Sequence, residues 1–190
     1  MASETGICNR ALQKLGAKRI TSLVQDSSNA RACNVAYEPV RDAELRAHPW
    51  NFAIKRATLA ADSVAPDWGR ARSFQVPADF LRLLPPYPED NLNNLDWQIE
   101  GQKIMTDDSD PLYIRYVARI TDPNEMDALF QEALSTRLAL ELCEEITQSN
   151  TKKAALEEDY KKIIREARRL NAFESPSSKP PEDEWITVRN

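Results

Sequence analysis

The chain has 190 residues, of which 42% are apolar and 29% are charged, and its formal net charge is −5. This length favours one domain with appendages. The acidic balance argues against a protein that reads DNA sequence, because such proteins present a basic patch. Four glycines against twelve prolines argue against a glycine-rich phosphate-binding loop and favour helices joined by stiff loops.

The first predicted helix covers residues 3–15. Ser3 can accept amide hydrogen bonds at its start, and Gly16 suits the left-handed backbone position that follows its end. Its apolar residues recur at helical spacing and form one stripe: Ile7, Ala11, Leu12 and Leu15. We therefore expect one face of this helix to pack against the core.

A second helix is predicted to run to about Ala47, with Asp26 or Ser27 as its cap. Its inner face is expected to hold Ala30, Cys33, Tyr37, Val40, Glu44 and Leu45. Pro39 lies inside the pattern and predicts a kink or a break, because proline lacks the amide donor that a helix interior uses. Pro49 is expected to end the helix, because the residue before a proline avoids helical backbone angles.

From Trp50 onward the helical period gives way to strand-like alternation. Strands are predicted over residues 51–60, 74–76, 80–84, 97–100, 103–106 and 112–120. Gly101 and Gln102 predict a two-residue hairpin with a type II′ turn. The proline-containing connections over residues 61–72 and 85–94 are expected to be exposed loops.

Two further helices are predicted after residue 120. Asp122, Pro123 and Glu125 resemble a capping box with proline at the first helical position, so the third helix is expected to start there. Its apolar residues are Met126, Phe130, Ala133, Leu134, Leu138 and Leu142, widened by Leu129, Leu140 and Ile146. A fourth helix is expected from Ser149 or Asn150, with a stripe of Leu156, Tyr160, Ile163, Ile164, Ala167 and Leu170.

The fourth helix carries charges on its remaining faces. Glu157 and Lys161, and likewise Glu158 and Lys162, have the i, i+4 spacing of helical ion pairs. The basic residues Arg165, Arg168 and Arg169 lie nearer the helix C-terminus, where cations are favoured. These charges predict a solvated face, with a subunit interface as the alternative.

The order of elements predicts an α+β fold that is mainly α, a four-helix bundle with an inserted small antiparallel β-domain and an extended C-terminal tail. The bundle is expected to be discontinuous, over residues 1–48 and 121–173. Residues 49–120 would form the β-rich insertion. Residues 174–190 have no amphipathic period and are expected to form an extended docking tail.

The residues give little support to catalysis. His48 is the only histidine, and a histidine before a proline at a helix end is more often packed or capping than a base. Asp107, Asp108 and Asp110 lack the glycine and distal glutamate of a calcium loop, so an acidic turn is favoured. The three cysteines are widely spaced and are expected to be reduced, buried apolar groups. We therefore expect no catalytic, metal-binding or cofactor-binding residues.

Two segments predict structural or docking roles instead. His48, Pro49, Trp50 and Phe52 are expected to form the junction between the second helix and the first strand, with the aromatic rings fixing the strand to the helices. In the tail, Trp185, Ile186 and Val188 are apolar residues in a segment that otherwise resembles a disordered one. They predict a strand that docks on a partner with Trp185 as its anchor, the alternative being that they fold back onto their own domain.

Three segments together resemble a known family. They are ICNRALQKLGAKRITSLVQDSSNARACN near the start, RDAELRAHPWNFA at the junction, and VARITDPNEMDALFQEALSTRLALELC leading into the third helix. In order and pattern, over roughly residues 3–170, the chain resembles the tail tubular protein A family of short-tailed bacteriophages. The tail from Glu174 is outside this resemblance.

The resemblance implies a head-to-tail adaptor, a structural protein at the head–tail interface of the virion that is made in the bacterial cytoplasm and is not an enzyme. Such adaptors form a dodecameric ring under the portal protein, continue the DNA channel and carry the tail nozzle, a tubular protein B-like component. The implied partners are further copies of the chain, the portal and the nozzle, with DNA passing through the lumen without sequence-specific binding. No membrane partner is expected, because no apolar run is long enough to span a bilayer.

Other functions remain open on the residues alone. One is a small hydrolase or nuclease that uses His48 with nearby acids. Another is a regulatory module that binds a partner through its helical face. A third is a portal-side chaperone that leaves the virion.

Overall fold

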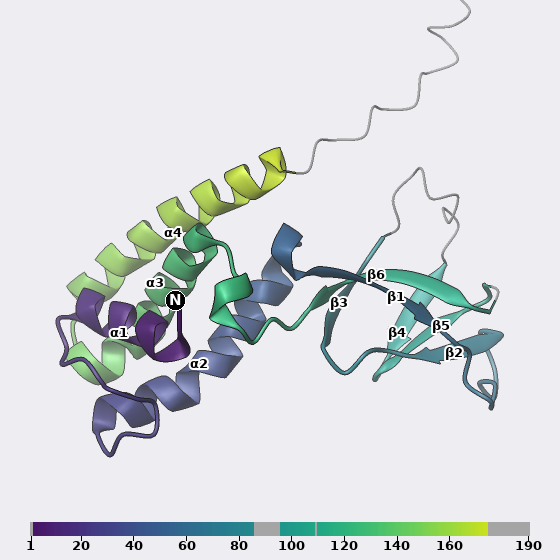
Figure 1. Cartoon of the computed structure of the whole chain (residues 1–190), viewed down its shortest axis with the longest axis horizontal. Coiled ribbons are helices and arrows are strands. Elements are labelled where there is room, and N and C mark those ends of the chain that lie inside the picture. Colours follow the sequence, from purple (N-terminus) through teal and green to yellow (C-terminus); the bar gives the residue numbers. More distant parts are fainter. Residues whose placement is uncertain (1, 86–95, 109, 175–190) are drawn as a thin grey trace, which may run out of the picture.

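The computed structural model describes residues 2–85, 96–108 and 110–174, which form a mixed α/β fold with four α-helices and two small antiparallel sheets (Figure 1). The helices gather at one end of the molecule and the sheets at the other. The chain passes from helices to sheets after α2 and returns after β6. The predicted combination of four helices with antiparallel strands is confirmed.

The first two helices begin and end where their capping signals indicate. α1 covers Glu4–Leu15, with the Ser3 hydroxyl accepting from the amide of Gly6 and Gly16 in the left-handed conformation at φ 72°. α2 covers Ser28–Ala47 and is capped by Ser27.

α2 continues through Pro39, so a break does not occur at this position. Pro39 lies on the exposed face of the helix, as does Val35, four residues earlier. The carbonyl of Val35 is the group that loses its amide donor to proline, and on this face water can replace the donor.

The prediction for the start of the third helix is wrong by five residues, because the cap is Asp127 and not Asp122. Asp122 caps only a single 3₁₀ turn over Pro123–Glu125. α3 covers Ala128–Thr147, and the Asp127 carboxylate accepts from the amides of Leu129 and Phe130. Between the two caps, Met126 takes an extended conformation and is buried in the core, which interrupts the helix.

α4 covers Asn150–Phe173 and begins at the predicted cap, Ser149. Leu156, Ile164 and Ala167 are buried as expected, but Leu170, predicted on the same stripe, is exposed. Lys161 pairs with both Glu157 and Glu158. The expected pairing of Glu158 with Lys162 is therefore replaced by a shared ion pair on Lys161.

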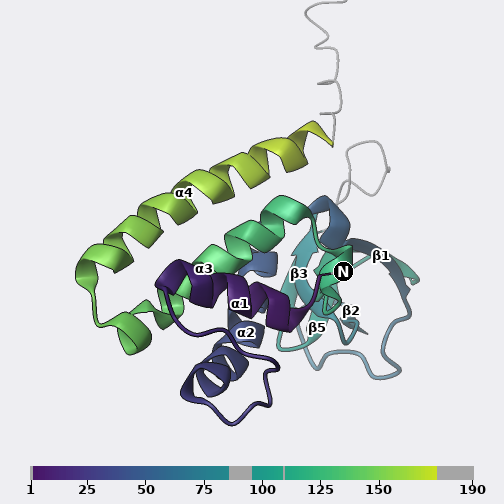
Figure 2. The same cartoon turned by 60° about the vertical axis from the view of Figure 1, so that its left-hand side comes forward.

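α3 is the central helix, with α1, α2 and α4 all packed against it (Figure 2). In both views α2 and α4 lie on opposite sides of α3. The side chains of Phe130, Leu134 and Leu138 on α3 are fully buried in the core. The three cysteines are free and buried, as expected for small apolar groups.

The strands form two antiparallel sheets. Their bounds are β1 Ile54–Leu59, β2 Arg72–Gln75, β3 Phe80–Leu84, β4 Trp97–Glu100, β5 Lys103–Thr106 and β6 Leu112–Ala118. One sheet has the order β1-β6-β3 and the other β2-β5-β4. The hairpin of β4 and β5 turns at Gly101 with φ 60°, as the predicted type II′ turn requires.

The first strand starts three residues later than predicted, because residues Asn51–Ala53 form a 3₁₀ turn. At β3 the ladder with β6 is irregular between Phe80 and Arg82. The carbonyl of Leu81 at this irregularity accepts a hydrogen bond from the Arg46 guanidinium, which ties β3 to the end of α2. Within the described ranges, none of the helices is both long and apolar enough to cross a membrane.

Candidate functional site

The junction between helices and sheets is built around Trp50. α2 ends at Ala47, and His48 leaves the helix with extended backbone angles, φ −143° and ψ 145°, as expected for a residue before proline. The chain then turns Trp50 back under the helix, where its side chain is only 1% exposed. The indole Nε1 donates a 3.0 Å hydrogen bond to the carbonyl of Glu44 in the last turn of α2.

Aromatic rings around Trp50 connect the junction to α3. Phe130 lies edge-on to Trp50 at a centroid distance of 5.1 Å and edge-on to Phe52 at the same distance. His48 lies edge-on to Trp50 at 4.7 Å. Such arrangements are the favourable ones for aromatic quadrupoles. The structure therefore brings three of the four predicted junction residues into one cluster with a ring from α3.

A polar pair fastens the end of α4 to the junction. The side-chain oxygen of Asn171 accepts from the backbone N–H of Asn51 at 2.8 Å, and the side-chain nitrogen of Asn51 donates to the backbone carbonyl of Asn171 at 2.8 Å. The Asn171 side-chain nitrogen also lies 3.2 Å from Nε2 of His48. Asn171 had no signal in the sequence, because it lies on a helix whose stripe pattern says nothing of a partner 120 residues away.

A buried carboxylate completes the junction. Glu44 is 6% exposed and accepts 2.8 Å hydrogen bonds from the Tyr160 hydroxyl of α4. The Arg137 guanidinium of α3 lies 3.6 Å away. Burial raises the pKa of Glu44, an effect that the Tyr160 hydrogen bond and Arg137 only partly oppose. A charged residue on the predicted apolar face of α2 was the one sequence signal for this cluster.

The raised pKa of Glu44 predicts a specific pH dependence of stability. The native carboxyl binds a proton more readily than the unfolded one, so acidification from about pH 7 to about pH 4 favours the native state through this group. We therefore expect the unfolding free energy of wild type minus that of Glu44→Gln to rise as pH falls. Urea titrations across this range measure the difference.

Glu38→Gln is the matched control, since Glu38 lies on the exposed face of the same helix. A wild-type minus Glu44→Gln difference that stays constant with pH would show that the Glu44 carboxyl does not titrate as proposed.

The chemistry available to His48 is limited by its partners. Burial, followed by the positive charges of Arg168 and Arg82, lowers the pKa of His48 and favours the neutral imidazole. The ring contacts Trp50 and Asn171, neither of which is an acid or a nucleophile. These contacts position the imidazole as a packing and hydrogen-bonding group of the junction.

The acidic residues after β5 accept hydrogen bonds from backbone amides of the loop between β1 and β2. Asp107 accepts from the amide of Ala71 at 2.7 Å, and Asp110 accepts from the amide of Ala61 at 3.0 Å. Within the described ranges, no three His, Cys, Asp or Glu side chains gather as metal ligands would. The predicted docking residues Trp185, Ile186 and Val188 lie outside the described residues.

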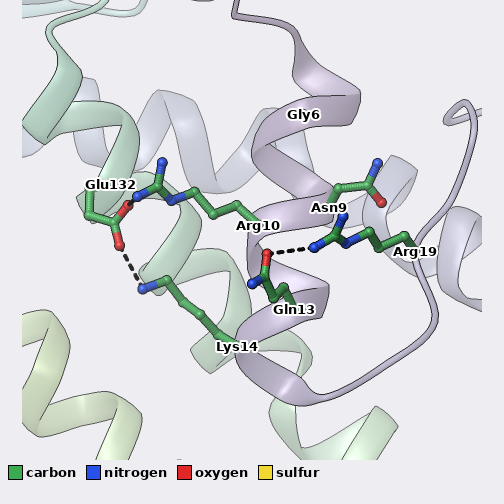
Figure 3. A pocket seen from close by; sticks show the side chains of 7 residues that line it. All are labelled: Gly6, Asn9, Arg10, Gln13, Lys14, Arg19 and Glu132. Carbon is green, nitrogen blue, oxygen red and sulfur yellow. Dashed lines mark hydrogen bonds and ion pairs between the residues drawn. The ribbon is translucent and has the colours of Figure 1, made fainter.

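A hollow of about 610 Å³ lies over α1 (Figure 3). Arg10 and Lys14 of α1 both point to Glu132 of α3, with Lys14 Nζ 2.7 Å from the carboxylate. Arg19 donates to the Gln13 side chain at 3.0 Å. Arg10 and Lys14 thus face Glu132, and these two ion pairs fix α1 onto α3.

A second depression, which we call the α2–α3 groove, has an apolar floor, two acids on its α3 side and Arg31 on its α2 side. Its volume is about 550 Å³, and Val35 in it is 74% exposed. The remaining apolar lining comes from Ala32, Ala36, Pro39, Val40 and Leu142. Glu141 and Glu145 of α3 line its other side. An exposed apolar strip with acids beside it is the kind of surface that a protein partner covers.

The loop between β1 and β2 presents Trp68, whose side chain is 89% exposed. Arg70 braces the loop by ion pairs of 2.6 Å to Asp96 and 2.9 Å to Asp107. Gly69 next to it has φ 89°, a left-handed angle that suits glycine. The sequence predicted an exposed loop here but did not single out its tryptophan.

A scan against protein-family models finds no match to the chain, and a search of curated proteins finds none either. The family resemblance therefore rests on the three sequence segments that carry it.

Proposed function

We propose that the chain is a virion structural protein, a head-to-tail adaptor that forms a ring between portal and tail nozzle and continues the DNA channel. The observation that carries the proposal is that the three family-like segments, distant in sequence, pack together. Lys14 from the first segment pairs with Glu132 from the third. Trp50 from the second lies against Phe130 from the third. Sequence segments that resemble a family because they encode its fold are expected to contact one another, and this packing supports the proposal.

In this proposal the four helices act as a bundle whose two sides differ in charge. The α2–α3 groove has Glu141 and Glu145 along its edge. On the opposite side of α3, the C-terminal half of α4 has an excess of exposed basic side chains, with Glu166 as its one exposed acid: Lys161, Lys162, Arg165, Arg168 and Arg169. Two different, complementary faces are what a head-to-tail contact needs, and such contacts form a ring when the rotation between successive copies closes. The second copy's α4 is thus the proposed occupant of the groove.

The β-rich part would face the next tail component. Its loop over residues 60–71 carries Trp68, and its second predicted loop, 85–94, lies outside the described residues except for Pro85. The acidic net charge of −5 suits a channel through which DNA slides, because a basic lumen would bind phosphate. Docking of the tail on portal or on a neighbouring subunit, through Trp185, Ile186 and Val188, stays a prediction.

The position of the chain in intact particles tests the proposed function. We expect electron microscopy of particles labelled with an antibody against this chain to place it between head and tail. Mass analysis of the purified particles should find it in multiple copies. Its absence from mature particles would contradict the adaptor function and favour a chaperone that leaves the virion.

A substitution in the α2–α3 groove tests the proposed ring contact. Val35→Arg places a cation where the basic face of α4 would bind, so we expect self-association to weaken by about 10-fold or more. Sedimentation velocity over a concentration series, with and without portal protein, measures the change. Val24→Arg is the matched control, since Val24 is 91% exposed and does not line the groove. Equal weakening by both variants would show that the groove has no special role.

A further inference from the structure

A cavity that we call the arginine pocket lies between β3 and the β4–β5 hairpin, beside the end of α2. Its volume is about 850 Å³. Arg46, Arg82 and Arg119 line it, and none of its described lining residues is Asp or Glu. Phe80, Trp97 and Ile99 contribute an apolar wall. The pocket therefore combines three positive charges with aromatic and aliphatic surface.

The three guanidinium groups differ in how they are satisfied. Arg46 donates to the Leu81 carbonyl, and Arg119 Nε donates to Asp42 at 2.7 Å. Nε of Arg82 is buried and has no hydrogen-bond partner among the residues that the structure describes. A buried donor without a partner is costly, and a guanidinium is best satisfied by a carboxylate. An acidic ligand would supply that missing acceptor.

We propose that, in the isolated protein, the arginine pocket binds residues 182–186 of the same chain. This segment reads Glu-Asp-Glu-Trp-Ile, with three successive carboxylates followed by two large apolar side chains. The carboxylates can pair with Arg82, whose Nε lacks an acceptor, and with donors of Arg46 and Arg119 that their present partners leave free. Trp185 and Ile186 match the wall formed by Trp97 and Ile99. Both the charge and the apolar character of the segment therefore fit this one pocket.

The end of α4 lies within reach of the pocket. The Asn51 side chain donates to the Glu174 carboxylate at 3.3 Å, so Glu174 lies at the junction. Arg46, which lines the pocket, belongs to the last turn of α2 at the same junction. Residues 175–181 can span up to about 25 Å when extended. A tether of this length gives a high effective concentration and favours binding within one chain.

The proposal does not depend on the adaptor function, and photo-cross-linking of the full chain tests it. With p-benzoylphenylalanine in place of Trp185, irradiation of the dilute protein should give an adduct of monomer mass. Peptide mapping should place the attachment within residues 75–83 or 97–102. Attachment elsewhere, or only between two copies of the chain, would overturn the proposal.

Charge reversal separates binding in the pocket from chance contact. Arg82→Glu should lower the cross-linking yield by about 10-fold, because a carboxylate at position 82 would repel the carboxylates of residues 182–184. Lys162→Glu makes the same charge change on the exposed surface of α4 and should leave the yield unchanged. Equal yields in all three proteins would contradict the proposal.

A measurement without a variant covers the case in which Arg82→Glu does not fold. Raising the salt concentration to about 1 M shortens the screening length to about 3 Å, so the yield of the otherwise unsubstituted chain should fall by about 5-fold. A yield independent of salt would show that the arginines do not hold the segment.

Discussion

Replacing Trp50 with alanine should lower the free energy of unfolding by about 3–5 kcal/mol, the range for removing a fully buried large aromatic side chain. The indole is 1% exposed and contacts the rings of His48 and Phe130. Its loss opens a cavity where α2, α3 and the start of the β-rich part meet. It also removes the hydrogen bond to the Glu44 carbonyl. A deficit of this size is a large fraction of the stability of an ordinary domain.

Urea denaturation of both proteins measures this effect, as a lower midpoint with an unchanged slope. His48→Gln is the control from the same junction. The glutamine amide can still hydrogen-bond Asn171, and the histidine ring is only half-buried, so we expect a loss of less than about 1 kcal/mol. A cost for His48→Gln as large as that for Trp50→Ala would mean that the imidazole, not the indole, organises the junction.

The elements that the sequence predicted correctly have signals contained within a few residues. Ser3, Ser27 and Ser149 begin helices because a side-chain oxygen satisfies free amides one turn ahead. Gly101 sets the hairpin for a similarly local reason, its positive φ. Asp122 carries an equally good local signal and yet caps only one turn. There the burial of Met126, a tertiary effect, decides the outcome.

The contacts that shape the candidate site are long-range and leave no periodic trace. Glu44 meets Tyr160, and Asn51 meets Asn171, across more than a hundred residues. The arginine pocket collects its charges from α2, β3 and the segment after β6. Periodicity predicts which face of an element is buried, but not which polar residue on another element lies opposite. These long-range pairings could therefore be identified only from the structure.

The junction has a mechanical consequence for the proposed adaptor. Trp50 and Phe52 hold the start of the β-rich part against α3, and the Asn51–Asn171 pair holds it against α4. The strands are thereby held directly on the helices that would form the ring. The loop that carries Trp68 would then take a fixed orientation relative to that ring. A fixed orientation favours a specific contact between this loop and the next tail component.

Trp68→Ala should therefore weaken binding of the nozzle component by about 30-fold or more while leaving the unfolding free energy within about 0.5 kcal/mol of wild type. The side chain is 89% exposed, so its removal costs the free protein little. Arg70 holds the loop through Asp96 and Asp107, which lowers the entropy lost when the tryptophan is buried in a partner. Surface-immobilised nozzle protein and a concentration series of the chain measure the affinity.

Val64→Ala in the same loop separates a tryptophan anchor from general loop contact. Val64 is also exposed, but a valine buries less apolar area than an indole, so its loss should change the affinity by less than about 5-fold. If Trp68→Ala binds the nozzle protein with wild-type affinity, the loop does not contribute to the nozzle interface through Trp68. An affinity lost only in Trp68→Ala, with stability intact, would indicate that an exposed tryptophan on a braced loop is kept because a partner buries it.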